Sequence, residues 1–181
     1  MRYLLGLEIC SFGVVGLSYG IWVVPSRNGP DYGECLVDLP LEADYSRGCS
    51  RTPPPGFSAA VVAAAEEFGG DPRLLATTVY VESGCDPKAL GSQGDVGLTQ
   101  IVPRFWAKEL HEHGISNLWS PEQNLRAGAY VLAVAASTTA STWDSVRRYN
   151  GSGKRASQYA ERHHKLYMDI WGEPYPDWSP N

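Results

Sequence analysis

With 181 residues, 43% of them hydrophobic, the chain can form one compact domain with additional segments, but not two domains of ordinary size. Its formal net charge is −5 and it contains no block of Lys or Arg, which excludes a protein that binds nucleic acid through a basic surface. The same mild acidity means that charge alone does not draw the protein to an anionic surface, so we expect another feature to localise it.

The N-terminal segment supplies such a feature. After Met1 and Arg2 the chain is almost wholly apolar from Tyr3 to Val24. At roughly 1.5 Å per residue, a helix of this length crosses a hydrocarbon core of about 30 Å. We expect residues 1–25 to form an uncleaved signal anchor whose residues 3–24 cross the membrane. A cleaved signal peptide is the alternative, but its apolar part is normally shorter and ends in an A-x-A-like site, which we do not find.

Residues 26–56 are rich in Gly, Pro, Asp and Ser. This composition is typical of a linker with little helix or strand. Cys35, Cys49 and Cys85 follow the apolar segment, in what would be an oxidising compartment. Cys35 and Cys49 flank a loop and are candidates to pair, which would leave Cys85 free or paired with another chain.

From residue 57 onwards the sequence predicts a series of helices. Asp71 is suited to an N-cap before Pro72, and the Ser-Pro-Glu-Gln sequence at 120–123 is typical of a capping box. We predict helices over residues 57–68, 72–83, 103–113, 121–136, 142–149 and 154–171. Because no stretch shows sustained strand-type alternation, the predicted fold is a mainly α single domain over residues 57–172, with an irregular tail at 173–181.

Glu82 lies at the end of the second predicted helix. It shares one helical face with Leu75 and Val79, and that face is otherwise apolar. Apolar surroundings raise the pKa of a carboxyl, and the negative end of a helix dipole acts in the same direction. A carboxylic acid that stays protonated near neutral pH can protonate a leaving glycosidic oxygen. Spacing alone also allows a solvated glutamate at a helix end.

A series of motifs follows Glu82 in a characteristic order. They are Glu82-Ser83, Gly97-Leu98-Thr99-Gln100-Ile101, Pro121 with Asn124 and Gly128, and Tyr149-Asn150-Gly151 with Tyr159 beyond. This order and spacing resemble the lytic transglycosylases related to the catalytic domain of the soluble enzyme (SLT type), over roughly residues 57–167. The resemblance implies a lysozyme-like fold of the goose type and cleavage of peptidoglycan glycan strands. Thr99 departs from the Met that is usual in this family.

The resemblance also implies roles for five residues. Glu82 matches the catalytic acid/base. The other four match residues that bind substrate: Ser83 supports the acid, Gln100 contacts sugar beside it, the Tyr149 hydroxyl faces it, and Asn150 lines the same cleft. No cofactor or metal is implied.

The reaction implied by the resemblance needs one carboxylate, whereas ordinary glycosidases use two. Glu82 would protonate the oxygen between N-acetylmuramic acid and N-acetylglucosamine, and the muramyl C6 hydroxyl would attack its own anomeric carbon. The product would be a 1,6-anhydro sugar, which makes the enzyme formally a lyase. A goose-type muramidase that uses water is a second possibility and would require Asp86 or Asp95. A third is a non-catalytic subunit that binds the cell wall.

We expect the catalytic domain to lie outside the cytoplasmic membrane, either anchored in the periplasm, secreted or part of a virion. Its expected partners are the peptidoglycan strand, the membrane and a secretion, conjugation or phage particle complex. For Arg147 and Arg148 we favour a solvated helix face over contact with anionic stem peptides. For His111, His113, His163 and His164 we favour helix surfaces over metal binding. Trp106, Trp119 and Trp143 are candidates for stacking on sugar, with core packing favoured for at least two of them.

Overall fold

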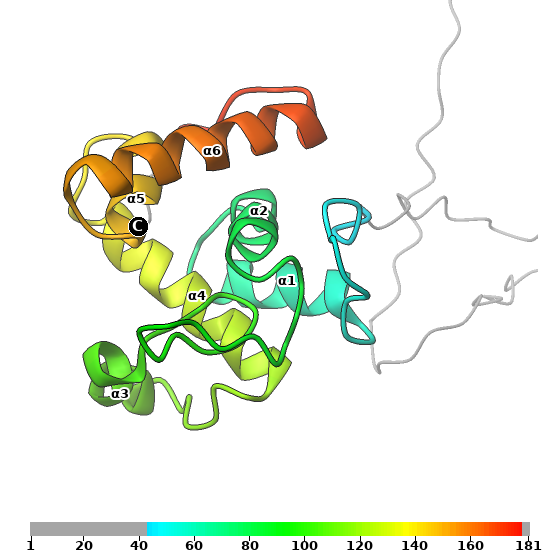
Figure 1. The fold of residues 1–181 in the computed structure, drawn as a ribbon, viewed down its shortest axis with the longest axis vertical. Helices are drawn as coiled ribbons and strands as arrows, with labels where there is room; N and C mark the ends of the chain where they lie inside the picture. The colour runs from blue at the N-terminus through cyan, green and yellow to red at the C-terminus, as the bar shows by residue number, and fades with distance from the viewer. Residues whose placement is uncertain (1–42, 179–181) are drawn as a thin grey trace, which may run out of the picture. The chain divides into compact units, whose positions relative to one another are not determined.

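The computed structural model describes residues 43–178, and these residues form a mainly helical domain with no named strand (Figure 1). The helices are α1 (Phe57–Glu67), α2 (Pro72–Glu82), α3 (Pro103–Glu112), α4 (Pro121–Ala136), α5 (Thr142–Tyr149) and α6 (Gly153–Trp171). The predicted fold class and helix positions are therefore confirmed to within one or two residues at each end. The predicted membrane segment at 3–24 lies outside the described residues. Within residues 43–178, no helix combines the length and apolarity needed to span a bilayer.

The helix α2 occupies the centre of the domain. It contacts α1, α4 and α6, and every residue from Leu74 to Tyr80 is buried. Asp71 begins the helix as predicted, because its side chain accepts a hydrogen bond from the Arg73 backbone nitrogen at 2.7 Å. Packing on three sides fixes the position of the last residue of α2, which is Glu82.

The start of α4 differs in one detail from the predicted capping box. Ser120 accepts a hydrogen bond from the Gln123 backbone nitrogen, as expected for an N-cap. The Gln123 side chain does not return to Ser120. Its oxygen accepts from the backbone nitrogens of Ser116 and Asn117 at 2.8 and 2.9 Å. Gln123 therefore holds the incoming loop rather than closing the box.

A long loop, residues 83–102, connects α2 to α3 and is held against α4 by Asn124. The buried Asn124 side chain accepts from the Thr99 backbone nitrogen at 2.8 Å and donates to the carbonyl oxygens of Val96 and Leu118, each at 2.9 Å. Gly128 allows the close approach, because a Cβ at this position would overlap the Thr99 side chain. The loop carries Ser83 and Gln100, which were predicted to bind substrate, and α4 fixes it in place.

The segment 43–56 was predicted to be part of a linker, but it packs on the domain. Tyr45 is buried in the largest apolar cluster, and its carbonyl oxygen accepts from the Tyr80 hydroxyl at 2.5 Å. The Arg51 backbone nitrogen donates to the Gly84 carbonyl at 3.0 Å. The packed part of the chain therefore begins before residue 57, because an aromatic anchor and backbone hydrogen bonds attach this segment to α2.

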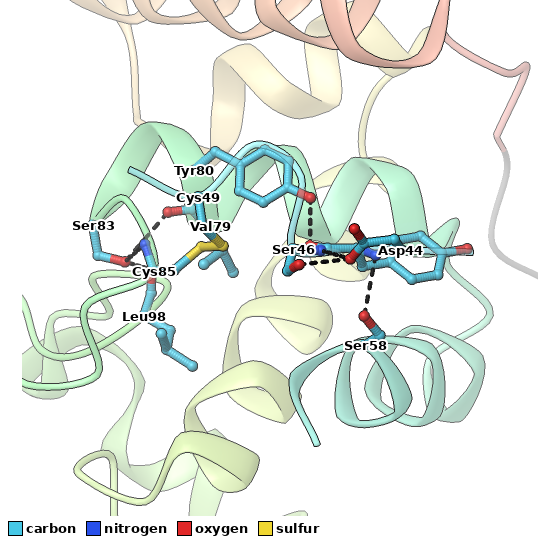
Figure 2. The surroundings of a disulfide bond; sticks show 10 residues. Asp44, Ser46, Cys49, Ser58, Val79, Tyr80, Ser83, Cys85 and Leu98 are labelled. Atoms are coloured by element: carbon cyan, nitrogen blue, oxygen red, sulfur yellow. Dashed lines mark hydrogen bonds between the residues drawn. A yellow bond between two sulfur atoms is a disulfide. The ribbon is translucent and has the colours of Figure 1, made fainter. Parts of the chain in front are cut away.

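A disulfide joins Cys49 to Cys85, with a Cα–Cα distance of 5.4 Å (Figure 2). The candidate pairing of Cys35 with Cys49 is therefore wrong. The chain turns after α2 with positive φ angles at both Gly84 and Cys85, and this turn directs Cys85 toward the segment that precedes α1. Nearness along the sequence favoured Cys35, but the fold decides which cysteines meet.

Residues 172–178, which follow α6, contain no helix, yet they are attached to the domain. The Trp178 indole nitrogen donates to the Gly69 carbonyl at 2.6 Å, and its backbone nitrogen donates to the Thr142 hydroxyl at 3.1 Å. The Tyr175 hydroxyl lies 2.7 Å from His163 Nδ1. These contacts cover one side of α2 and α6.

Candidate active site

Glu82 lines an open cavity of about 340 Å³. Side chains from α2, the loop 83–102, α3 and the end of α5 surround this cavity. Four residues chosen from the sequence lie in its wall: Glu82, Gln100, Tyr149 and Asn150. Segments that are far apart in the sequence therefore meet around one carboxyl group, in a space that a ligand can enter from solvent.

Burial raises the pKa of Glu82 to about 7, because the partly apolar surroundings disfavour the charged form. The nearby Tyr159 hydroxyl and the positive charge of Arg162 act in the opposite direction and lower the pKa. The negative charge of Asp95 raises it further. At neutral pH the carboxyl is therefore close to half protonated and can both donate and accept a proton.

Two tyrosines, Tyr149 and Tyr159, lie near the Glu82 carboxyl, whereas the sequence analysis gave this position to Tyr149 alone. The Tyr149 hydroxyl donates to the Thr99 backbone carbonyl at 2.7 Å. Tyr159, on α6, is buried near Glu82, and its hydroxyl has no hydrogen-bond partner among the described residues. The two rings are stacked, with centroids 6.5 Å apart. Tyr159 belongs to the motif series, but the sequence gave no indication that it lies near the acid.

Ser83 connects the end of α2 to the loop rather than lining the cavity. Its hydroxyl donates to the Leu98 carbonyl at 2.7 Å and accepts from the Cys85 backbone nitrogen at 3.2 Å (Figure 2). These two contacts fix the backbone directly after Glu82. The structure therefore places Ser83 next to the acid as a positioning residue.

Gln100 has a positive φ of 50°, and its amide nitrogen donates to the carbonyls of Ala89 and Gly97 at 3.2 and 2.9 Å. The loop thus holds the Gln100 side chain in the cavity wall. Asn150 follows α5 as its C-cap residue, is exposed, and lines the same cavity. Both are placed where they can contact a ligand in the cavity.

The two candidate second carboxylates lie in different places. Asp95 lines the cavity with Glu82. Asp86 is not part of the cavity lining: it pairs with Arg51 at 3.5 Å and accepts from the Lys88 backbone nitrogen at 2.9 Å. If a second carboxylate takes part in the reaction, Asp95 is the one in position.

Aromatic side chains also line the cavity, and the sequence analysis did not identify one of them, Phe105. Phe105 is 63% exposed and lines the cavity beside Trp106. Trp119 is 51% exposed but is not among the lining residues, and Trp143 packs edge-on against His164. The signal available in the sequence was the position of this Phe directly before Trp106, on a short amphipathic helix.

His163 is fully buried among α2, α6 and the tail. Its Nε2 lies 3.1 Å from the Thr78 hydroxyl, and burial lowers its pKa to about 3. The neutral ring therefore joins three segments of the core, in place of the helix surface predicted for it. Among residues 43–178, no group of three or more His, Cys, Asp and Glu side chains is arranged to hold a metal ion.

The family model described as "Transglycosylase SLT domain" matches residues 59–169. A transglycosylase of Enterobacteria phage PRD1 is 39% identical over 70 residues, which cover 39% of this chain and 25% of the relative. An endo-type membrane-bound lytic murein transglycosylase A of Klebsiella pneumoniae is 31% identical over 74 residues, which cover 37% of this chain and 36% of the relative. A membrane-bound lytic murein transglycosylase F of Desulfosudis oleivorans is 35% identical over 79 residues, 44% of this chain and 16% of the relative. The similarity thus spans well under half the length of each of these relatives.

Proposed function

Because this chain belongs to the transglycosylase SLT domain family, we propose that it is a peptidoglycan lytic transglycosylase with Glu82 as its single catalytic acid/base. The observation that carries this proposal is the Glu82 carboxyl itself. It lies in an open cavity, and burial raises its pKa to about 7. Such a group can act first as an acid and then as a base within one turnover.

The proposed reaction begins when protonated Glu82 gives its proton to the oxygen between N-acetylmuramic acid and N-acetylglucosamine. The bond from the muramyl anomeric carbon to that oxygen breaks. The C6 hydroxyl of the same muramyl residue then attacks the anomeric carbon, and the Glu82 carboxylate takes its proton. The product is a 1,6-anhydro sugar, no water is consumed, and Glu82 returns to its protonated form. An internal nucleophile is already held near its target, so no second carboxylate is needed to activate water.

The test is a digest of purified peptidoglycan, with the products weighed by mass spectrometry beside a Glu82→Gln control. The proposal expects muropeptides one water lighter than hydrolysis products, and a loss of at least about a hundredfold in rate for Glu82→Gln. The Gln variant keeps the size and hydrogen bonding of the side chain, so circular dichroism should show an unchanged fold. Cleavage at the wild-type rate by this variant would contradict the assignment of Glu82.

Hydrolysis by water is the second candidate, because Asp95 lines the cavity with Glu82. It predicts products with free reducing ends, and a large loss of rate for Asp95→Asn. The transglycosylase reaction predicts anhydro products from both the wild type and Asp95→Asn. No release of fragments by a folded protein would leave a wall-binding role.

We propose further that residues 3–24 anchor the protein in the membrane and that the catalytic domain acts outside it, where a tether favours local opening of the wall over bulk digestion. The apolar length of this segment supports the proposal. Local opening suits the assembly of a secretion or conjugation apparatus and the entry of a phage genome. Fractionation of cells that express the full chain tests the anchor. The protein should be found in the membrane fraction and should resist extraction by carbonate. Deletion of residues 3–24 should abolish both the membrane association and the resistance to carbonate.

A further inference from the structure

The segment 45–51 is attached to the chain on both sides of Glu82. The backbone carbonyl of its first residue accepts a hydrogen bond from the hydroxyl of Tyr80, two residues before Glu82, at 2.5 Å. Near its other end, Cys49 forms a disulfide with Cys85, three residues after Glu82 (Figure 2). The segment therefore bridges the last turn of α2 and the turn that follows it, and Glu82 lies between the two attachments.

The turn after Glu82 has an unusual backbone. Gly84 and Cys85 both have positive φ angles, of 60° and 75°. Glycine adopts such an angle freely, but a residue with a side chain keeps it only where its surroundings hold it there. Two attachments hold Cys85, which are the disulfide and the hydrogen bond from its backbone nitrogen to the Ser83 hydroxyl at 3.2 Å. The conformation of the turn therefore depends in part on the disulfide.

The segment also packs directly on this turn. The Arg51 backbone nitrogen donates to the Gly84 carbonyl at 3.0 Å, and a Cβ on Gly84 would overlap the Ser50 hydroxyl. Because atoms packed this closely cannot move independently, a displacement of residues 49–51 is expected to move the turn and with it the end of α2.

The bridging segment lies outside the part of the chain that matches the family model. That match begins at residue 59, whereas Cys49 and the rest of the segment 45–51 precede it. Cys85 lies inside the match, next to the proposed catalytic residue. The disulfide therefore joins an additional segment to the active-site end of α2.

We propose that Cys49 and Cys85 are positioning residues for Glu82, and that their disulfide makes activity depend on the redox state of the surroundings. This inference rests on the proposed function, because it assumes that Glu82 carries out the reaction. A dithiol reduces the disulfide to two thiols, giving up two electrons and two protons, and is itself oxidised to a cyclic disulfide. The domain stays folded, but Cys85 can leave its positive φ, and the turn and Glu82 move. Full activity is then confined to an oxidising compartment.

The test measures kcat and KM on soluble glycan strands for the full chain in detergent, oxidised and after reduction by dithiothreitol. Circular dichroism of the same samples gives the folded fraction. In the folded, reduced protein, kcat should fall by roughly tenfold with little change in KM, because a small displacement of a catalytic group costs alignment rather than binding. Cys35→Ser is the matched control and should show the same fall on reduction.

Two double variants test the role of the backbone at residue 85. Cys49→Ala with Cys85→Ala should behave like the reduced protein and should not respond to dithiothreitol. Cys49→Ala with Cys85→Gly should recover part of kcat, because glycine keeps the positive φ without strain.

The pH profile of kcat/KM gives a second measurement. Burial raises the pKa of Glu82 to about 7, so water that reaches a displaced carboxyl should lower this pKa and move the alkaline limb to lower pH. The ionisable groups that act on Glu82 from neighbouring elements are the same in all these proteins: Asp95, Tyr149, Tyr159 and Arg162.

Four results would overturn the inference. These are an unchanged kcat in the folded, reduced protein; a loss of activity that follows the unfolded fraction at every concentration of reductant; a rise in KM with unchanged kcat; and equal kcat for the two double variants. A failure of the proposed function is recognised separately, since the oxidised wild type then fails to cleave the strands. If the oxidised protein cleaves them and reduction changes nothing, only the redox dependence is wrong.

Discussion

Glu82 shows how one residue acquires a chemical role from its surroundings. A glutamate at the end of an ordinary surface helix ionises near its usual pKa of about 4.3. Here α2 is packed on three sides, and the side chain lies near the hydroxyls of Tyr149 and Tyr159, on whose pKa values its charge acts. Removal from water raises the pKa to about 7, and this is the property that the proposed reaction uses.

The pH dependence of activity follows from this pKa. The proposed reaction starts from protonated Glu82, so kcat/KM should fall about tenfold per pH unit above roughly pH 7. Tyr159→Phe removes a nearby hydroxyl that favours the carboxylate, so the pKa should rise and the alkaline limb should move to higher pH. Asp95→Asn removes a negative charge that disfavours the carboxylate, so the limb should move to lower pH. The measurement is the pH profile of kcat/KM on soluble strands. Shifts in the same direction for both variants would show that these groups do not set the pKa of Glu82.

Asn124 is the residue on which the active-site loop depends most. Asn124→Ala should lower the free energy of unfolding by about 2–4 kcal/mol, because the buried Thr99 nitrogen and the Leu118 carbonyl lose their partner and the Val96 carbonyl keeps only the bond from the Ile101 nitrogen. The measurement is urea denaturation. Gln123→Ala is the control: it also removes bonds to two backbone groups, but these are exposed to water, so the loss should be below about 1 kcal/mol. Equal losses would mean that Asn124 does not hold the loop.

At the scale of elements, the end of α2 is held from two sides. The loop 83–102 contacts it through Ser83 and Leu98, and the segment before α1 contacts it through the disulfide and the Arg51 backbone. Glu82 lies between these attachments and the body of the helix. A short helix would otherwise fray at its last turn, where backbone carbonyls lack partners within the helix.

The Cys49–Cys85 disulfide should therefore stabilise the domain measurably. Reduction by dithiothreitol, or the double change Cys49→Ser and Cys85→Ser, should lower the free energy of unfolding by about 2–4 kcal/mol. The measurement is chemical denaturation with and without reductant. The double variant should show no further response to reductant. A continued response would assign the effect to another pair of cysteines.

At the scale of the whole domain, the tail closes one side of the core. Trp178 lines a small space together with Leu74, Leu75 and Leu132 from α2 and α4. It also donates a hydrogen bond to the carbonyl of Gly69, in the turn between α1 and α2. An irregular segment at the end of the sequence thus contributes to the packing around α2.

Trp178→Ala should lower the free energy of unfolding by about 1–3 kcal/mol, because both this packing and the hydrogen bond to Gly69 are lost. Trp119→Ala is the matched control. Because Trp119 is 51% exposed, its replacement should lower the free energy of unfolding by less than about 1 kcal/mol. Thermal unfolding of the two variants makes the comparison. A smaller loss for Trp178→Ala than for Trp119→Ala would mean that the tail is not part of the cooperative domain.

The sequence by itself determined the features that are local along the chain. The six helices follow from caps such as Asp71 and from apolar spacing, and Glu82 follows from its place at the end of an apolar helical face. The ordered motifs identified part of the cavity wall, including Gln100, Tyr149 and Asn150. Each of these signals needs only neighbouring residues or a fixed order of motifs.

Only the tertiary structure decided which distant groups meet. It paired Cys49 with Cys85, joined the Tyr149 hydroxyl to the Thr99 carbonyl, and placed Arg148 in the cleft while Arg147 pairs with Asp144. It also packed Tyr45 and Trp178 on the domain. These outcomes depend on how helices pack and turn in three dimensions. The free energy of each such contact depends on two residues that are far apart in the sequence.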